Sequence, residues 1–431
     1  MQRQGGASVR TVLESGPLSV QPPPDGVGRY ETSETINVAW DGQLPDHASW
    51  RLHLGTWDEA RWPRVHVNLA AAPHLADMVL GLDCRDRVTI TNLPSVLPPG
   101  DVDVIAEGYA ETLGLYDWDV TLNCSPGRPW RVAEYDTARY GTAGSVLTSA
   151  VGSGDTTLTV STAGPLWTSA VADMPIPITV GGEDLSVTAV TNGAADTFTR
   201  STTSGWGTSS SGHTWTHIGG AATDYPVVSS IGRMDHTAIN VWHRSYLTVQ
   251  VSDFDLEADL FTNALAVSDA IFVQLMARAT GTGTHEMYEA RLELRTNQTV
   301  FATIRCRTTT ATTPLASGTV PGITHAANTR LKVRFQGEGP RLRMKVWDQN
   351  TTEPQFWHLA ATDTTYASGV IGAASLLGPA STNTLPVRCS CDELVLRNPQ
   401  RMTVVRSVNG ITKGHPAGAA VALADPAIRA L

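Results

Sequence analysis

The sequence predicts a mainly β protein built from three units. Residues 1–135 are expected to form a small α+β domain, and residues 136–203 join 399–431 in a small split β domain that resembles a barrel. Residues 204–398 are expected to form an inserted antiparallel β-sandwich of the jelly-roll type. Two observations support this division. A chain of 431 residues exceeds one ordinary core, and only 17% of its residues are charged while short alternating runs dominate, which favours strands.

The first unit contains the only segment that the periodicity marks as helical, from Pro73 to Leu82. Strand-like alternation surrounds this segment. The expected strands are 64–69, 86–91, 102–109 and 116–124. A short helix combined with four strands is typical of a small α+β domain.

The split domain is expected to draw on both sides of the insertion. Its first part has three short alternating runs, at 156–160, 176–180 and 185–190, and Gly181-Gly182 indicates a tight hairpin between the last two. Neither residues 145–200 nor residues 400–431 contain enough strand to bury a core alone. We therefore expect the segment 185–190 to pair with or lie beside 403–408. The Ser/Gly/Thr-rich run 201–212 and Asn398-Pro399 are then expected to act as paired hinges.

Residues 204–398 show strands of sandwich-like length and spacing. The clearest runs are 246–251, 270–277, 288–294, 300–305, 330–335, 342–347 and 391–396. On the run 288–294 two glutamates, Glu289 and Glu293, interleave with Arg291 and Arg295, a mixed face that is able to pair across a sheet.

Composition excludes several classes of function. The formal charge of −10 and the lack of a basic stripe argue against nucleic-acid binding. No apolar run reaches the length of a membrane span, and the N-terminus lacks the apolar segment of a secretory signal. The five cysteines show no C-x-x-C spacing, so we expect buried free thiols, with Cys389 and Cys391 on one strand face.

Four carboxylates alternate with apolar residues between positions 253 and 259: Asp253, Asp255, Glu257 and Asp259. A strand would place them on one face, which is either exposed to solvent or a cation site, with calcium as the candidate. Hydrolysis of glycans is disfavoured, because the run Glu257-Ala-Asp259-Leu-Phe-Thr262 ends in Thr where the second carboxylate of the catalytic pair is needed.

Aromatic residues are the candidates for glycan binding, because an aromatic ring can stack on the C–H face of a pyranose. The candidate residues are Trp206, Trp215, Trp347 and Trp357, with Trp242 as a further aromatic of the same zone; core packing is the alternative for each. His213 and His217 have metal-like spacing but no third ligand, so we expect surface histidines. No nucleophile motif or phosphate-binding loop occurs, so the chain is not expected to be an enzyme.

Two segments carry a resemblance to a known family. Residues Asp86–Trp118 and Thr403–Pro426 resemble parts of minor tail or tail-tip proteins, associated with the baseplate hub, from long-tailed phages of actinobacteria. Residues Trp347–Asp363 resemble the laminin-G or concanavalin-like jelly roll that is often inserted in those proteins.

The resemblance implies a structural virion protein at the distal tail, made in the host cytoplasm. It implies other tail and baseplate proteins as partners, a homo-oligomer of three or six copies, and attachment to host cell-wall glycans through the sandwich. Two rival functions remain open: a bacterial surface or secreted lectin, and a jelly-roll glycan hydrolase.

Overall fold

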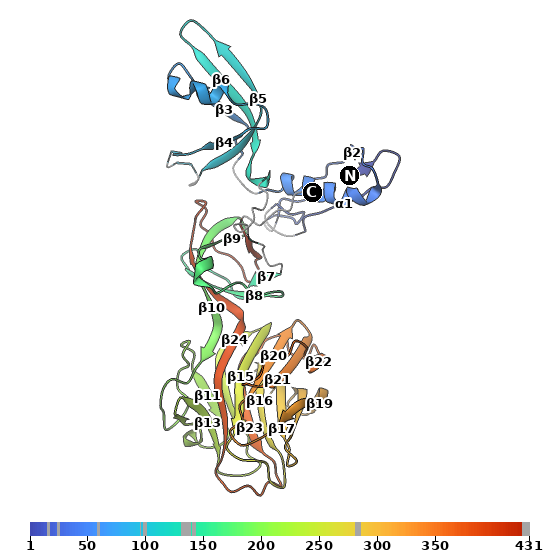
Figure 1. Cartoon of the computed structure of the whole chain (residues 1–431), viewed down its shortest axis with the longest axis vertical. Coiled ribbons are helices and arrows are strands. Elements are labelled where there is room, and N and C mark those ends of the chain that lie inside the picture. Colours follow the sequence, from blue (N-terminus) through green and yellow to red (C-terminus); the bar gives the residue numbers. More distant parts are fainter. Residues whose placement is uncertain are drawn as a thin grey trace.

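The computed structural model describes residues 1–14, 18–23, 26–57, 61–94, 96–97, 101–130, 139, 144–280 and 286–424. Strands dominate this part of the chain, and they build three units that follow one another along the long axis of the molecule (Figure 1). The mainly β fold class is therefore confirmed. The expected boundary between residues 135 and 136 lies outside the described residues.

The first unit contains a four-stranded antiparallel sheet in the order β3-β6-β5-β4. Its strands are β3 (Arg64–Asn68), β4 (Arg87–Ile90), β5 (Val102–Leu113) and β6 (Trp118–Pro126). The predicted helix is present as a 3-10 turn at Pro73–Leu75 that continues into α2 (Ala76–Leu80). Leu69, Val79, Val120 and Leu122 form a small core between helix and sheet.

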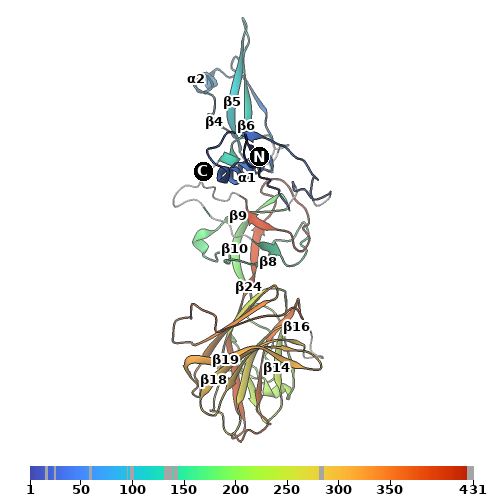
Figure 2. The same cartoon turned by 90° about the vertical axis from the view of Figure 1, so that its right-hand side faces the viewer.

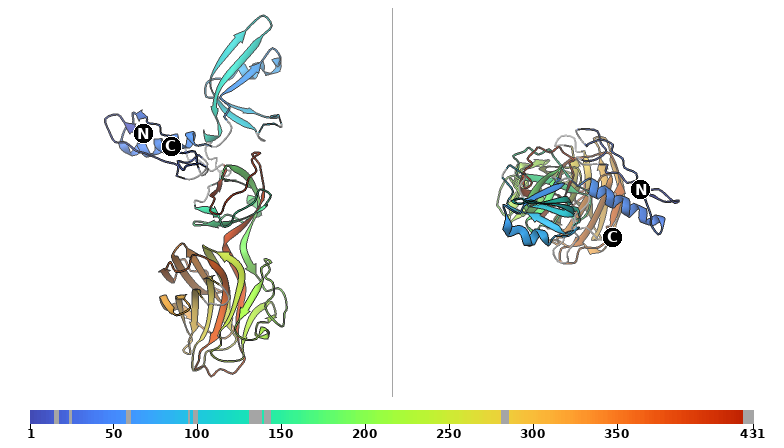
Figure 3. Two further views of the ribbon diagram at one scale, coloured as in Figure 1. Left: turned by 180° about the vertical axis from the view of Figure 1, so that it is seen from behind. Right: turned by 90° about the horizontal axis from the view of Figure 1, so that it is seen from above.

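The longest helix of the described residues, α1 (Leu44–Gly55), was not predicted. It follows a 3-10 turn at Asp41–Gln43, and a two-stranded parallel pair, β1 (Gln2–Arg3) and β2 (Thr35–Ile36), precedes both. Only Leu44 and Ala48 of the helix are buried. A helix with so narrow an apolar stripe has little hydrophobic periodicity, which is why the sequence pattern did not indicate it. Seen from above, it extends to one side of the stacked units (Figure 3).

The split domain is a small closed barrel. Its strands are β7 (Ser145–Leu147), β8 (Thr157–Thr162), β9 (Ile176–Val180), β10 (Glu183–Asp196), β24 (Val387–Val405) and β25 (Val421–Leu423). The pairing runs β7-β8-β24-β10-β9-β25. A bridge between Val146 and Ala420 joins the last strand to the first, so the barrel has no free edge. A 3-10 turn, Val171–Asp173, lies between β8 and β9.

The predicted pairing across the insertion is confirmed. Val187 on β10 lies opposite Val404 on β24, and both side chains belong to one core with Leu158, Ile178 and Val421. The predicted hairpin is also present, since Val180 pairs with Glu183 around Gly181-Gly182. Both glycines have positive φ, which is the conformation that a two-residue hairpin turn needs.

The expected hinges are wrong. Both connections between barrel and sandwich are strands: β10 and β24 each pass from one unit into the other (Figure 1). Beyond the crossing the two strands are paired again, from Ala194 opposite Leu396 onward. At the crossing, a Cβ on Gly193 would lie 2.1 Å from the carbonyl oxygen of Pro399, so the two backbones approach closely there. A hinge requires soft backbone, and a hydrogen-bonded pair of strands does not provide it.

The sandwich consists of two packed antiparallel sheets (Figure 2). One sheet continues from the barrel through β24 and adds β12 (Val227–Val228), β13 (Ile231–His236), β15 (Phe254–Thr262), β20 (Leu331–Glu338), β21 (Arg341–Asp348) and β22 (Leu359–Thr362). The other is seven-stranded, in the order β11 (Trp215–Ile218), β14 (His243–Val251), β23 (Gly369–Leu377), β16 (Ile271–Ala279), β17 (Met287–Leu294), β18 (Thr299–Arg307) and β19 (Thr312–Thr324). A 3-10 turn, Ala222–Asp224, precedes β12.

The sandwich core begins earlier than residue 204. Ala194 and Phe198 pack in the same core as Trp206 and Trp215, and the rings of Trp206 and Trp215 meet edge to face at 4.8 Å. The run 201–212 is therefore anchored to the sandwich by Trp206 rather than free as a linker. The sequence signal misled here, because Ser, Gly and Thr surround a single buried tryptophan.

Buried polar side chains occupy the end of the sandwich near the start of β14. His236 and His243 meet at 4.2 Å between ring centroids, and His236 Nε2 lies 2.7 Å from the hydroxyl of Ser375. Burial lowers the pKa of His236 to about 3. His217 is also partly buried: it accepts a hydrogen bond from the backbone N–H of Trp206, so the expectation of a surface histidine is wrong for His217.

All five cysteines are free. Cys306, Cys389 and Cys391 are buried as expected, and the last two both face the sandwich core. Cys84 is exposed, which differs from the prediction. Among the described helices, none has the length and apolar character needed to cross a membrane.

We predict that Glu183 stabilises the split barrel. This buried carboxylate binds Arg406 at 2.6 Å and His415 at 2.8 Å, both from the segment beyond the insertion. Burial alone would raise its pKa, but these bonds outweigh burial and lower the pKa to about 2. The stabilisation is thus complete above the ordinary pKa of 4.5 and is lost as the pH falls towards 2.

Replacing Glu183→Gln should lower the free energy of unfolding by about 3 kcal/mol at neutral pH, because Arg406 is left buried without its partner. Thermal or denaturant unfolding measures this change. Glu338→Gln is the matched control, since the Glu338 side chain is 38% exposed and lies 3.5 Å from its arginine. Equal stability of the Glu183 variant and the wild type, together with an unchanged acid transition, would contradict the prediction.

Candidate functional site

The outer face of the seven-stranded sheet carries the most unusual group of polar side chains in the described structure. Along each strand, alternate residues point into the sandwich core and the rest point outward. We call the outward set on the four strands β14, β16, β17 and β18 the arginine face. Its residues are Arg244, Tyr246, Phe272, Gln274, Met276, Met287, Glu289, Arg291, Glu293, Phe301, Thr303, Arg305 and Arg307.

The strand register places these side chains in rows across the sheet. One row is Arg244, Ala374, Gln274, Arg291 and Thr303. The next row is Tyr246, Gly372, Met276, Glu289 and Arg305. β23 therefore contributes only the short side chains Ala374 and Gly372 between the long side chains of its two neighbouring strands.

Glu289 is the electrostatic centre of this face. Its side chain is fully buried, it forms an ion pair with Arg305, and it lies 2.9 Å from Arg307 and 2.9 Å from the amide of Gln274. Burial opposes ionisation, but the two arginines outweigh it and lower the pKa of Glu289. The carboxylate is thus ionised at neutral pH, and it orients two arginines.

Trp242 lies beside β14 and contacts two arginines of the face. Its ring is 4.9 Å from the guanidinium carbon of Arg244 and 5.4 Å from that of Arg307. The ring is partly buried against an apolar cluster that contains Tyr246 and Met276. The indole is therefore held in place by apolar contacts and by cation–π attraction.

Several buried donors of the arginine face have no hydrogen-bond partner among the described residues. These atoms are Nε of Arg244, Arg291 and Arg305 and the hydroxyl of Tyr246. Burial raises the pKa of Tyr246 to about 12, and burial followed by repulsion from Arg305 lowers the pKa of Arg291 to about 10. Native structures rarely leave buried donors unpaired, so we expect water or a ligand to accept hydrogen bonds from these four.

The face is poorly equipped for hydrolysis. Glu289 and Glu293 lie on β17 with Arg291 between them, and retaining glycosidases use a pair of carboxyl groups, one of which must be protonated as the general acid. The lowered pKa of Glu289 opposes that role. Glu293 lies 2.8 Å from Arg295 and 3.7 Å from Arg291. The arrangement is suited to binding rather than acid catalysis.

Three of the four predicted glycan-binding tryptophans cannot stack on a sugar. Trp206, Trp215 and Trp347 are at most 5% exposed. Trp206 donates to the carbonyl of Arg233, and Trp215 donates to Asp196. Trp206 and Trp215 fill the sandwich core, where burying a large apolar ring stabilises the fold, whereas Trp347 is covered on the outer face of β21 beside Lys345. The prediction is therefore wrong for them.

Trp357 is partly exposed, but basic side chains surround it. Arg334, Arg343 and Lys345 lie within 5.6 Å of its ring centre. Lys345 and Arg334 in turn bind Glu353. Trp357 is thus part of a charge-paired surface on the outer face of the other sheet.

The predicted carboxylate face on β15 exists, but it is neither open to solvent nor a cluster of acids. Asp255, Glu257 and Asp259 are each at most 7% exposed. Their partners are Arg334 at 2.5 Å, Arg397 at 2.6 Å and Lys332 at 2.9 Å respectively. Asp253 accepts from the N–H of Gly339.

A calcium site at these residues is not supported. Within the described part of the chain, no group of three or more His, Cys, Asp or Glu side chains has an arrangement that could hold a metal. The expectation of a solvent-exposed face is wrong, because the sequence pattern shows which residues share a strand but not which basic residues the neighbouring strands contribute.

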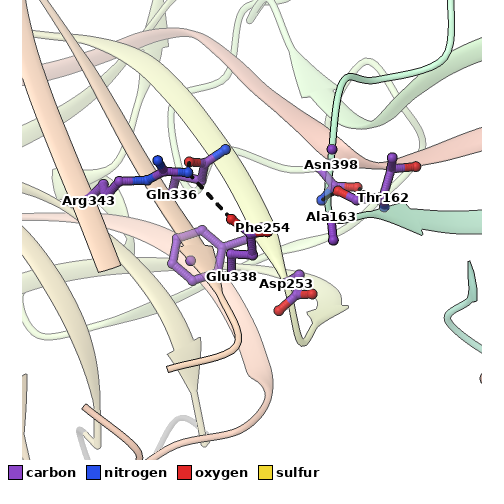
Figure 4. A pocket seen from close by; sticks show the side chains of 10 residues that line it. Thr162, Ala163, Asp253, Phe254, Gln336, Glu338, Arg343 and Asn398 are labelled. Carbon is purple, nitrogen blue, oxygen red and sulfur yellow. Dashed lines mark hydrogen bonds and ion pairs between the residues drawn. The ribbon is translucent and has the colours of Figure 1, made fainter. Parts of the chain in front are cut away.

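A small cavity of about 180 Å³ lies where barrel and sandwich meet, between Thr162 and Asn398 on one side and Asp253, Glu338 and Arg343 on the other (Figure 4). Its polar groups bind one another. Asn398 exchanges hydrogen bonds with the backbone of Thr162 at 3.1 Å, and Arg343 pairs with Glu338. We interpret the cavity as a packing gap at the junction.

Comparisons with known proteins provide a limited fold likeness. No family model and no curated protein matches the chain. Among solved structures, the carbohydrate-binding module CBM66 from Bacillus subtilis is 14% identical with a TM-score of 0.29, covering 42% of this chain and 92% of its own.

Two further solved structures match a similar share of the chain. A β-glucanase from Bacillus licheniformis is 15% identical with a TM-score of 0.35, and the match covers 48% of this chain and 96% of the glucanase. Lectin I-B4 from Griffonia simplicifolia is 10% identical with a TM-score of 0.30, and the match covers 42% of this chain and 92% of the lectin. Likeness this weak does not bear on ligand or activity.

Sequence reasoning recognised only part of the arginine face. The alternation of glutamate and arginine on β17 was noted, and the expected cross-sheet pairing is present between Glu289 and Arg305. Arg244, Tyr246 and Gln274 gave no signal, because they belong to strands whose register only the structure defines. Trp242 was one of several tryptophans, and its exposure was not readable from sequence.

We predict that calcium has no effect on stability. Because the carboxylates of β15 already have cationic partners, adding calcium or a chelator should leave the midpoint of thermal unfolding unchanged. Differential scanning fluorimetry measures this. A clear rise of the midpoint with calcium, lost in Asp255→Asn but kept in Asp348→Asn, a partly exposed aspartate outside the carboxylate face, would reverse this interpretation.

Proposed function

We propose that this chain is a structural, non-enzymatic phage tail-tip protein whose β-sandwich binds saccharides of the host surface through the arginine face. The observation that carries the binding role is the set of unpartnered buried donors on the face whose edge holds Trp242 against Arg244. Hydroxyl-rich ligands satisfy such donors, and a partly exposed indole supplies the apolar contact that sugars favour.

The tail-tip assignment rests on the resemblance of Asp86–Trp118 and Thr403–Pro426 to minor tail proteins. In this proposal the amino-terminal unit attaches to other tail or baseplate proteins in a trimeric or hexameric ring, and the sandwich projects outward. The β5–β6 hairpin fits an attachment role, because Leu113, Leu115 and Tyr116 at its tip are at least 69% exposed and would gain from burial. The protein would be made in the host cytoplasm and carried on the virion.

Substitution of Trp242 tests the binding site. Trp242→Ala should weaken binding to soluble cell-wall saccharides of an actinobacterial host by about tenfold, because one stacking contact and two oriented arginines are lost. Isothermal titration calorimetry or a glycan array measures the affinity. Trp40→Ala is the control, since Trp40 is 63% exposed in the amino-terminal unit and should leave affinity unchanged.

Circular dichroism must show that the Trp242 variant remains folded. If wild type and variant bind the saccharides equally, the arginine face is not the binding site. Immunogold labelling of virions with antibody to the sandwich tests the tail-tip assignment separately; label at the distal tail supports it, and label only on the capsid or none on the particle refutes it.

A glycan hydrolase is the second candidate, because Glu289 and Glu293 share a strand face on a sandwich. We expect no release of reducing sugar from β-glucans or cell-wall polysaccharide, since Glu289 is held ionised by Arg305 and Arg307. A reducing-end assay measures this. If the wild type releases reducing sugar, and this activity is lost in Glu289→Gln but kept in the control Glu338→Gln, then the protein is an enzyme and the binding-only role is refuted.

A further inference from the structure

We infer that the arginine face selects acidic saccharides, whose carboxylate or phosphate groups bind between Arg244, Arg291 and Arg305. This inference rests on the proposed saccharide binding and adds the chemical class of the ligand. It follows from charge, from the geometry of the unpaired donors, and from contrast with the other outer face of the sandwich.

The charge of the arginine face has the opposite sign to that of the whole chain. The protein carries a formal charge of −10, whereas this face contains four arginines and two glutamates. Arg295 lies at its edge, paired with Glu293. A local excess of positive charge in an acidic protein does not serve solubility, and it attracts anions at close range.

The glutamates do not satisfy the arginines. Glu289 binds Arg305 through one terminal nitrogen and Arg307 through Nε, and Arg305 Nε remains without a partner. Arg244 is only 5% exposed, and its Nε is also unpaired. Burying an arginine whose donors are unsatisfied is costly, so an incoming anion recovers that cost on binding.

The three arginines lie on three different strands of the face, β14, β17 and β18. Arg291 lies in the same cross-strand row as Arg244, and Arg305 lies in the next row beside Glu289. Ala374 leaves the first row free of long side chains between Arg244 and Gln274, and Gly372 does the same in the next row between Tyr246 and Met276. The guanidinium of Arg244, which lies beside this gap, offers donors that match the planar oxygens of a carboxylate or the oxygens of a phosphate.

The outer face of the other sheet shows what a purely structural charged face looks like in this protein. There, Asp255, Glu257 and Asp259 each pair with a basic side chain of a neighbouring strand, and Asp392 pairs with Arg330, just before β20. Its basic residues are therefore neutralised within the protein. The arginine face has too few acids for that, so its surplus is not explained by sheet pairing.

The experiment compares three soluble probes by calorimetry: polygalacturonate, which carries carboxylates, wall teichoic acid, which carries phosphates, and the neutral glucan laminarin. We expect one or both anionic probes to bind and laminarin to bind at least about tenfold more weakly, since it cannot form charge-assisted hydrogen bonds. Binding should also weaken as salt is raised, because salt screens the attraction.

Arg244→Gln and Arg291→Gln should each weaken binding of the anionic probe about tenfold and reduce its salt dependence. Arg341→Gln, an exposed arginine on the other sheet, is the matched control and should bind as wild type. Gln keeps much of the length of Arg, and thermal unfolding will show whether each variant is folded. A variant that fails to fold is replaced by Arg→Lys, which keeps the charge but loses the planar donors.

The outcomes separate the two proposals. If laminarin binds as tightly as the anionic probes and Trp242→Ala weakens it, saccharide binding stands and the acidic specificity is wrong. If anionic binding is unchanged in both arginine variants, the acidic specificity is wrong regardless of affinity. If no probe and no host saccharide binds, the proposed function itself fails.

Discussion

The antiparallel pair formed by β10 and β24 is the constraint on which the architecture depends. The two strands close the split barrel, cross together into the sandwich, and there continue as part of one of its sheets. Asn398 and Gln400 of β24 fix the crossing by bonding the backbones of Thr162 and Trp167 from the barrel. An insertion whose ends leave through one hydrogen-bonded pair costs little closure entropy and needs no flexible linker.

This pair also explains how much of the fold could be predicted. The pairing of 185–190 with 403–408 could be predicted because the sequence around each segment contains too few strands to bury a core alone. The number of apolar strand residues can be counted from the sequence. The continuity of β24 could not be predicted from the sequence, since a proline such as that of Asn398-Pro399 usually marks the end of a strand. The helix α1 was missed for the opposite reason, because only Leu44 and Ala48 distinguish its buried side.

The candidate site was less predictable than the fold, because it depends on register between strands. Trp206 and Trp357 are alike in sequence, yet one is fully buried and the other is surrounded by arginine and lysine. Likewise, the carboxylates of β15 suggested a cation site until Arg334 and Lys332 were found opposite them. Alternation within a strand indicates which side chains share a face, while charge balance is decided by the strands on either side.

The two outer faces of the sandwich therefore differ in how many of their charged side chains lack a partner. The paired strands at the crossing also fix the direction in which the arginine face points. Because β10 and β24 are paired on both sides of the junction, the sandwich cannot turn freely on the barrel, and the arginine face is held in one orientation to the barrel. In a ring of several copies, that constraint would present every arginine face at the same angle. Several sandwiches could then bind one polymeric saccharide at the same time. After the first copy has bound, the next site meets the saccharide at a high effective concentration, so weak individual affinities give a strong overall attachment.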